Sequence, residues 1–238
     1  MRRDMRQLYE ASDWVFDLDN TLYPPESDLF SQISAKMNEY VAKFLDLPHD
    51  EAREVQKKYY VDHGTTLNGL LIHHDVDAHD YLHHVHDIDY SGLKKDLELR
   101  EAILGLKGRK IIFTNGSFRH AEKAIDALGL NGLFHDILDI AGTNFSPKPQ
   151  HDAFETLIKT HNIVPQTSVM VEDLSKNLVT AHELGFSTIL VWSNKFWHDE
   201  PKGHAPAGEA DIDGAHIHYA TNNLASFIKE VVKTGAEG

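Results

Sequence analysis

The chain has 238 residues, of which 41% are hydrophobic and 25% are charged, and its formal net charge at pH 7 is -14. This composition predicts one folded domain, or one domain plus a small accessory domain. The negative charge disfavours DNA, RNA and anionic membranes as partners, because like charges repel over long distances. The absence of cysteine excludes disulfides, thiolate metal sites and a cysteine nucleophile.

Neither a membrane span nor a signal peptide is expected. The sequence contains no run of about 18 apolar residues, the length that a membrane-spanning helix needs. The basic start of the chain is followed by a mixed, acidic stretch that lacks the apolar core of a signal peptide. We therefore expect a cytoplasmic protein, and its oligomeric state, monomer or homodimer, stays open.

The first strong element is the apolar run Trp14-Val15-Phe16, which predicts a buried strand that leads into Asp17 and Asp19. Apolar residues then recur at helical spacing as far as residue 86. The helices expected in this stretch cover residues 27–47, 51–60, 67–73 and 78–86, the first of them ended by Leu47-Pro48. They predict an all-helical block, residues 23–100, inserted as a small cap domain after the first strand. The catalytic core would then comprise residues 1–22 and 101–238.

From residue 108 onward, predicted strands alternate with predicted helices. The strands cover residues 110–113, 137–140, 168–171 and 188–192, and the helices cover residues 119–128, 152–160 and 176–184. Such alternation predicts an α/β fold, a Rossmann-like parallel sheet with helices on both faces. Residues 193–214 predict a surface loop and residues 223–233 a last helix, after which we expect residues 235–238 to fray.

Ligands of open parallel sheets bind beyond the carboxyl ends of the strands. In this sequence those ends carry polar residues: Asp17 and Asp19, Thr114-Asn115-Gly116, Lys148 in the loop after the third strand, and Glu172-Asp173. Carboxylates, a hydroxyl and an ammonium group brought together can bind Mg²⁺ and a phosphoryl group at once. We therefore interpret this edge of the sheet as a phosphoryl-transfer site.

The order of these residues resembles the haloacid dehalogenase superfamily. The superfamily pattern Asp-x-Asp-x-Thr is matched by Asp17, Asp19 and Thr21, and its later motifs are matched by Thr114, by Lys148 within Ser146-Pro147-Lys148-Pro149, and by Glu172-Asp173. Any one of these matches is weak. Four matches in the correct order, each at its expected place in the fold, make the resemblance specific.

The resemblance implies a role for each residue. Asp17 would form an aspartyl-phosphate, and Asp19 would protonate the leaving oxygen and later activate water. Thr114 and the amide of Asn115 would bind the phosphoryl oxygens, and Lys148 would neutralise charge near Asp17. The Mg²⁺ ion would be bound by Asp17, the main-chain carbonyl of Asp19 and Asp173, with Glu172 or Asn177 assisting through water.

The resemblance also narrows the chemistry. Asp19 favours a phosphatase, because dehalogenases of this superfamily lack an acid at that position. A helical insertion between the first two motifs implies a small, soluble phosphomonoester as the substrate. Three segments look like the pyrimidine 5'-nucleotidase branch, which implies a nucleoside monophosphate such as UMP or CMP: residues 20–24, 59–70 and 86–90.

Several alternatives remain open at this stage. A sugar-phosphate phosphatase or a phosphomutase would keep both Asp17 and Asp19, and a phosphonate hydrolase would need a Schiff-base lysine in the helical block. A non-catalytic binding module would commonly lose the nucleophile or the acid, and neither is missing. His79 and His83, one helical turn apart, have a spacing that can bind zinc, but solvated or substrate-facing positions are favoured.

Overall fold

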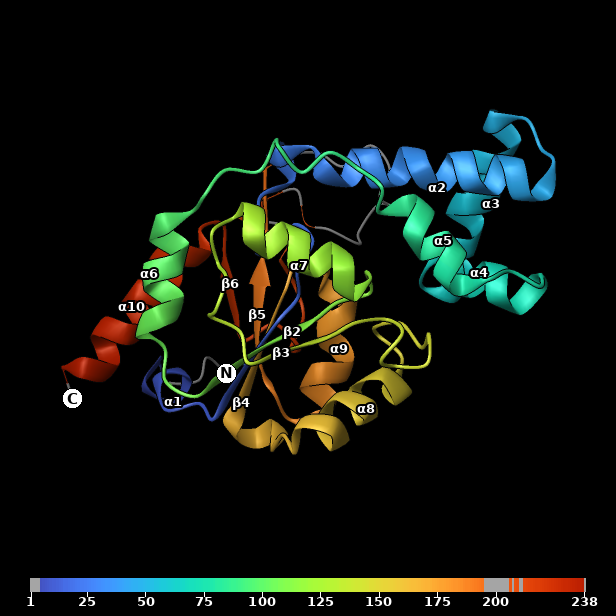
Figure 1. The fold of residues 1–238 in the computed structure, drawn as a ribbon. Helices are drawn as coiled ribbons and strands as arrows, with labels where there is room; N and C mark the ends of the chain where they lie inside the picture. The colour runs from blue at the N-terminus through green and yellow to red at the C-terminus, as the bar shows by residue number, and fades with distance from the viewer. Residues whose placement is uncertain (1–4, 195–205, 207, 210–211, 238) are drawn as a thin grey trace.

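The computed structural model describes residues 5–194, 206, 208–209 and 212–237, and its centre is a six-stranded sheet (Figure 1). The strand order is β3-β2-β1-β4-β5-β6, and every neighbouring pair is parallel. The strands are β1 (Asp13–Phe16), β2 (Arg109–Phe113), β3 (Asp136–Leu138), β4 (Ser168–Glu172), β5 (Ser187–Val191) and β6 (Tyr219–Thr221). The predicted Rossmann-like parallel sheet is therefore confirmed.

Helices cover both faces of the sheet. Successive residues of a strand point to opposite faces, so a strand that is apolar throughout must be covered on both. Trp14 and Phe16 of β1 pack into one hydrophobic cluster, whereas Val15 packs into another. The first cluster includes residues of α1 (Met5–Tyr9), α6 (Leu97–Gly105), α7 (Phe118–Ala127) and α10 (Leu224–Ala236), and the second includes residues of α8 (His151–His161) and α9 (Ser175–Leu184). All four residues of β1 are buried, as expected of a central strand in such a sheet.

The inserted helical block consists of α2 (Leu29–Leu45), α3 (His49–His63), α4 (Thr66–His73) and α5 (Ala78–Val85), and it extends to one side of the sheet in Figure 1. It has a hydrophobic cluster of its own, which includes Tyr81 and Val85 and is joined from the sheet side by Ile140. The Thr65 and Asp77 side chains cap the first amides of α4 and α5 and so fix where these helices begin. No helix in the described part of the chain is long and apolar enough to cross a membrane.

Helix α6 and strand β6 are two of the elements that were not predicted. Helix α6 begins at Leu97, and its buried Leu99 and Ile103 lie in the same cluster as Ile228 of α10, so it packs beside the sheet. The inserted block was expected to end at residue 100, which lies within α6, a helix that packs beside the sheet. Strand β6 has three residues, too few to show an alternating pattern. Most of the loop expected at residues 193–214 lies outside the described residues.

The prediction that residues 235–238 fray is wrong for the described part of that segment. Helix α10 continues to Ala236, and Gly235 lies against the side chain of Tyr9 in α1. A Cβ atom at position 235 would come within 2.0 Å of the Tyr9 ring, so only glycine allows this contact. The packing of α1 against α10 thus orders residues 235 and 236. The hydrophobic spacing along α10 alone did not predict this contact.

The packing of α8 on the sheet gives a direct test of the fold. Phe154 is fully buried and makes an edge contact with Phe113 of β2, with ring centroids 5.3 Å apart. We expect Phe154→Ala to lower the free energy of unfolding by about 3 to 5 kcal/mol, because it leaves a cavity at this contact. Phe118→Ala, at a side chain that is 44% exposed, is the matched control and should cost less than about 1 kcal/mol in urea denaturation. Equal losses in the two variants would contradict the packing.

Candidate active site

Asp17 directly follows β1, which lies between β2 and β4 at the point where the strand order reverses. The chain then turns back on itself: the amides of Thr21 and Leu22 donate to the carbonyl oxygen of Leu18, and Asn20 adopts a left-handed φ of 62°. Asparagine tolerates this conformation better than most residues. The turn brings the Thr21 hydroxyl to 2.9 Å from Oδ2 of Asp17, to which it donates, and so fixes the Asp17 side chain.

Lys148 lies buried beneath the ends of three strands. Its Nζ donates to Oδ1 of Asp17 at 2.6 Å, to Oε2 of Glu172 at 2.8 Å and to the carbonyl oxygen of Phe113 at 2.8 Å. An ammonium group has three N–H donors, and each of these donors is used here. One buried cation is thus shared by two buried carboxylates, which leaves an excess of negative charge in the site.

The residues after β2 support this arrangement. Asn115 pairs with the backbone of Lys148, accepting from its amide at 2.8 Å and donating to its carbonyl oxygen at 3.3 Å. The hydroxyl of buried Thr114 accepts from the amide of Gly116 at 2.9 Å, so its own proton can be donated to a ligand. The Asn115 side chain therefore positions the Lys148 loop, a role that the sequence did not indicate, and phosphate binding by its amide stays a proposal.

Asp17, Glu172 and Asp173 form an acidic cluster in which one carboxylate oxygen from each residue lies within 4.8 Å of the other two. Asn177 donates to Oε1 of Glu172 at 3.0 Å, and its own buried Oδ1 has no hydrogen-bond partner among the described residues. A set of oxygen ligands with one unsatisfied oxygen fits a hard divalent cation such as Mg²⁺. Both oxygens of Glu172 already accept hydrogen bonds from the protein, which suits the supporting role expected of this residue.

The electrostatics of the cluster also favour a cation. Burial and the charge of Glu172 raise the pKa of Asp17 to about 7, although Lys148 acts in the opposite direction. Burial lowers the pKa of Lys148, but the charges of Asp17 and Glu172 more than offset it, so that its pKa lies above the ordinary value. The ammonium group therefore stays charged, and the site has more negative charge than it alone can balance.

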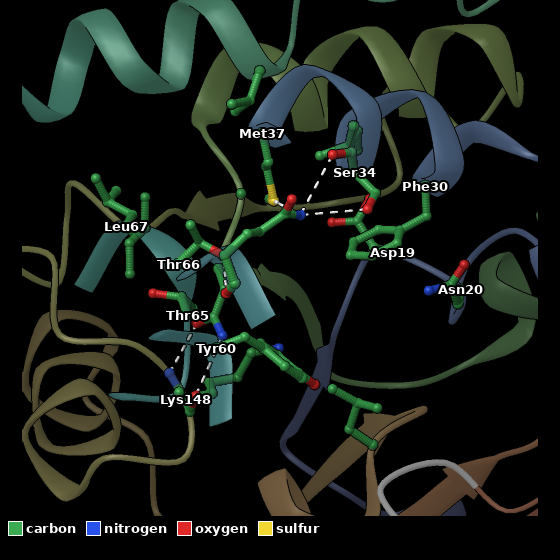
Figure 2. A pocket seen from close by; sticks show the side chains of 18 of the residues that line it. Asp19, Asn20, Phe30, Ser34, Met37, Tyr60, Thr65, Thr66, Leu67 and Lys148 are labelled. Carbon is green, nitrogen blue, oxygen red and sulfur yellow. Dashed lines mark hydrogen bonds between the residues drawn. The ribbon is translucent and has the colours of Figure 1, made fainter. Parts of the chain in front are cut away.

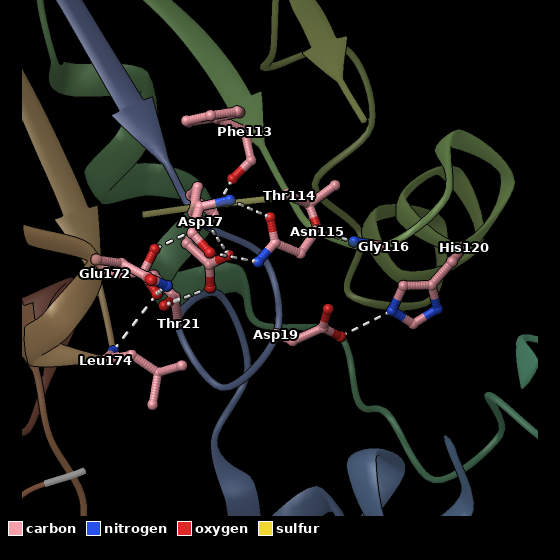
Figure 3. Close-up of polar contacts among 12 residues, drawn as sticks. Asp17, Asp19, Thr21, Phe113, Thr114, Asn115, Gly116, His120, Glu172 and Leu174 are labelled. Carbon is pink, nitrogen blue, oxygen red and sulfur yellow. Dashed lines mark hydrogen bonds and ion pairs between the residues drawn. The ribbon is translucent and has the colours of Figure 1, made fainter. Parts of the chain in front are cut away.

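Asp19 lies between this cluster and α7 (Figure 3). Its Oδ1 accepts from the hydroxyl of Tyr23 and from Nε2 of His120, the latter at 2.7 Å. Burial raises the pKa of Asp19, but the charge and hydrogen bond of His120 and the hydrogen bond of Tyr23 lower it to about 2. Neither partner of Asp19 was predicted from the sequence. The one signal for His120 is its place in the first turn of the helix after β2, beside the predicted site.

A pocket lies between the helical block and the carboxyl edge of the sheet (Figure 2). The sheet side of its wall includes Asp17, Asp19, Asn115, Lys148 and Asp173, and the side formed by the block includes Phe30, Arg53, Gln56, Lys57 and Tyr60. The Nζ of Lys176 in α9 lies 4.0 Å from the ring centroid of Tyr60 in α3, a cation–π contact that connects the two sides. The predicted strand-end residues therefore converge on one cavity, with the exception of Thr114, which is buried and does not line it.

The two histidines with zinc-like spacing do not join this site. His79 and His83 are exposed on α5, and the ring of His79 packs against Phe145. Within the described residues, the acidic cluster is the one group of three or more acidic or histidine side chains close enough to share a metal ion. The structure gives the zinc hypothesis no support.

Most of the chain matches the model of a known protein family. This model is described as haloacid dehalogenase-like hydrolase, and it matches residues 15–185. The chain belongs to this family of hydrolases. The matched region runs from β1 to the end of α9, so it includes the helical block and every residue of the acidic cluster.

The curated relatives include phosphate metabolism protein 8 of Saccharomyces cerevisiae (strain ATCC 204508 / S288c), which is 26% identical over 195 residues. That alignment covers 74% of this chain, and the chain spans 60% of the length of the relative.

Solved structures with the same fold include CbbY from Rhodobacter sphaeroides in complex with phosphate (TM-score 0.59, 17% identity, 91% and 96% of the two chains). Another is L-2-haloacid dehalogenase from Xanthobacter autotrophicus with chloropropionic acid covalently bound (0.57, 15%, 93% and 98%). A third is a HAD phosphatase from Thermococcus onnurineus (0.56, 18%, 92% and 97%). The neighbours include a phosphatase and a dehalogenase, so the fold leaves the reaction to be decided by the site residues.

The raised pKa of Asp17 predicts an effect on stability. A carboxyl group with a raised folded-state pKa contributes stability below its unfolded pKa of about 4, and this contribution is lost as the pH rises through about 7. Asp17→Asn keeps an oxygen for Lys148 but removes the titration. In EDTA, we expect the variant to gain stability relative to the wild type between pH 5 and pH 8, by on the order of 1 kcal/mol or more in urea denaturation.

Asp152→Asn, at an exposed carboxylate in the first turn of α8, is the control for this measurement and should show no such trend. A stability difference between Asp17→Asn and the wild type that stays constant over this pH range would show that Asp17 does not carry the raised pKa.

Proposed function

We propose that this hydrolase is a Mg²⁺-dependent phosphomonoesterase that acts through an aspartyl-phosphate on Asp17, and that its preferred substrates are pyrimidine nucleoside monophosphates. The observation that carries the choice of phosphate chemistry is the position of Asp19. It shares the pocket with Asp17, and it can exchange a proton with a leaving oxygen. A halide leaving group needs no such proton, so a dehalogenase would have no use for this carboxyl group.

In the first step an oxygen of Asp17 attacks phosphorus opposite the leaving oxygen. A bound phosphoryl group raises the low pKa of Asp19 through its negative charge, so that Asp19 can take up a proton in the complex. As the bond between Asp17 and phosphorus forms, the bond from phosphorus to the leaving oxygen breaks, and Asp19 donates that proton to the leaving oxygen. The ammonium group of Lys148 favours the ionised form of Asp17 and neutralises charge as the transition state develops. The hydroxyl of Thr114 and the amide of Asn115 hold the phosphoryl oxygens.

In the second step Asp19 takes a proton from a water molecule that attacks phosphorus, and the bond to Asp17 breaks to release phosphate. Asp17, Asp173 and the main-chain carbonyl of Asp19 would hold Mg²⁺, with Asn177 and Glu172 assisting. When bound, the metal would neutralise the phosphoryl oxygens and bring them beside Asp17. The helical block would act as a cap that encloses the leaving group and limits the access of water.

The pocket wall formed by the helical block supports a nucleoside as the leaving group. Phe30 and Tyr60 present aromatic rings against which a base could stack. A side-chain oxygen of Gln56 has no hydrogen-bond partner in the described part of the chain, and an N–H of a pyrimidine base could donate to it. These features support the nucleotidase branch that the sequence resembles.

A second candidate is a phosphatase or phosphomutase that acts on sugar phosphates with a further anionic group. The observation in its favour is that Arg53 and Lys57 bring two positive charges to the same wall. Such charges would attract a second phosphate or a carboxylate on the substrate. A phosphomutase would return the phosphoryl group to a sugar, whereas a phosphatase releases it to water.

Asp17 and the metal can be tested together. We expect Asp17→Asn to lower phosphate release from the best substrate by at least about 1,000-fold, because it removes the nucleophile. EDTA should abolish wild-type activity, and added Mg²⁺ should restore it. Asp152→Asn is the control and should retain full activity. Unchanged phosphate release by Asp17→Asn in the presence of Mg²⁺ would refute the mechanism.

The substrate class can be tested by a phosphate-release screen with Mg²⁺ over nucleoside monophosphates, sugar mono- and bisphosphates and lysophospholipids. UMP and CMP should have the highest kcat/KM, and Gln56→Leu should raise KM for them more than it changes kcat, because Gln56 would contact the base. A preference for a sugar bisphosphate would favour the second candidate. A rate of zero for every phosphomonoester would revive the non-catalytic binding module.

A further inference from the structure

His120 is completely buried, and it directly contacts the residue to which we assign the proton transfers. It lies in the first turn of α7, and its Nε2 is 2.7 Å from Oδ1 of Asp19. Oδ1 has no proton to donate when Asp19 is ionised or when its proton is on Oδ2, so in both states Nε2 carries the proton of this contact. Tyr23 donates to the same Oδ1 atom. Both donors approach one oxygen, which leaves Oδ2 as the atom that can hold or release a proton.

The His120 ring is held in this orientation by contacts from separate parts of the chain. On its far side, Nδ1 is 2.9 Å from the hydroxyl of Tyr90, in the segment that connects the helical block to α6. One face of the ring stacks on His86, which ends α5, with centroids 4.5 Å apart and planes inclined by 14°. The Nδ1 of His86 is in turn 3.0 Å from the hydroxyl of Ser117, so the stacked partner is also fixed.

Gly116 provides the space for this pair of rings. A Cβ atom at that position would lie 3.1 Å from Cδ2 of His120, 3.2 Å from Oγ1 of Thr114 and 3.6 Å from Nε2 of His86. The loop that carries Thr114, proposed to bind phosphate, therefore also forms the surface against which His120 lies. The placement of Asp19 and the shape of the phosphate loop are thus linked through one ring.

We propose that His120 is a positioning residue for Asp19: its Nε2–H holds Oδ1 so that Oδ2 faces the leaving oxygen. The proposal rests on the proposed phosphatase function. During the first step, a proton on Oδ2 passes to the leaving oxygen while the bond from that oxygen to phosphorus breaks and the bond from Asp17 forms. Without His120, the hydrogen bond from Tyr23 alone would restrain Oδ1, so the Asp19 side chain would rotate more freely and would adopt the geometry required for proton transfer less often.

The dependence on the leaving group distinguishes positioning from a purely structural role. An aryl phosphate such as p-nitrophenyl phosphate releases a stable anion that needs no proton, whereas an alkyl phosphomonoester needs one. Release of the leaving group in a single turnover should be measured for p-nitrophenyl phosphate and for the fastest alkyl phosphomonoester of the screen. We expect His120→Ala to slow the alkyl ester by about 10- to 100-fold and the aryl ester by less than about 5-fold.

Two further variants strengthen the test. Adding His120→Ala to Asp19→Ala should cause no additional loss with the alkyl ester, because a residue that acts through Asp19 has nothing to position once that side chain is gone. His120→Gln keeps a side-chain N–H and should recover part of the rate. The matched control is His161→Ala, which removes a buried histidine that lies 3.7 Å from Asp136, the first residue of β3, away from the strand ends that form the site. It should leave the ratio of the two rates unchanged.

Equal loss with both esters, or a further loss in the double variant, would overturn the proposal. If His120→Ala does not fold, as judged by circular dichroism, the rates for the two esters should be measured for His120→Gln and Tyr90→Phe instead. A loss confined to the alkyl ester in Tyr90→Phe supports positioning, and an equal loss with both esters refutes it. Failure of the proposed function itself would appear separately, as phosphate release that survives Asp17→Asn.

Discussion

The buried Lys148 ammonium is the interaction on which the rest of the site depends. It donates to Asp17 and Glu172 at once, and it also reaches the backbone of β2 through the carbonyl oxygen of Phe113. A buried charge is costly unless it is paired and hydrogen-bonded, and here each N–H has an acceptor. The arrangement connects the ends of β1, β2 and β4, and it leaves a net negative charge that a divalent cation would neutralise.

The strand order explains why these residues meet. With β1 between β2 and β4, the polar residues after the three strands lie at the same edge of the sheet, at the point where the strand order reverses. The inserted helical block stands over the same edge because it begins shortly after Asp17 and ends before β2. The sheet thus holds the groups that we propose to be reactive, while the block contributes the opposite wall of the pocket, which would face the leaving group in the proposed reaction. This division is consistent with the family assignment and leaves substrate choice to the block.

Much of this could be predicted because the signals are local. Apolar runs followed by Asp17, Thr114 and Glu172 indicate strand ends, and parallel topology then implies that they converge. The contact between Asp19 and His120 could not be predicted in this way, since the two residues are 101 positions apart and their meeting depends on how α7 leaves β2. Strand β6 was too short for a periodic signal, and the packing of Gly235 on Tyr9 depends on the shape of a tertiary contact.

Asp17 is proposed to be the nucleophile that forms a covalent aspartyl-phosphate, and this intermediate can be observed directly. A phosphomonoester substrate with labelled phosphate should be mixed with the Mg²⁺-loaded enzyme and quenched in acid within one turnover, and the labelled peptide should be mapped. The account predicts label on Asp17, at a level that falls as free phosphate appears. Label on another residue, or phosphate release with no labelled protein at any time, would contradict it.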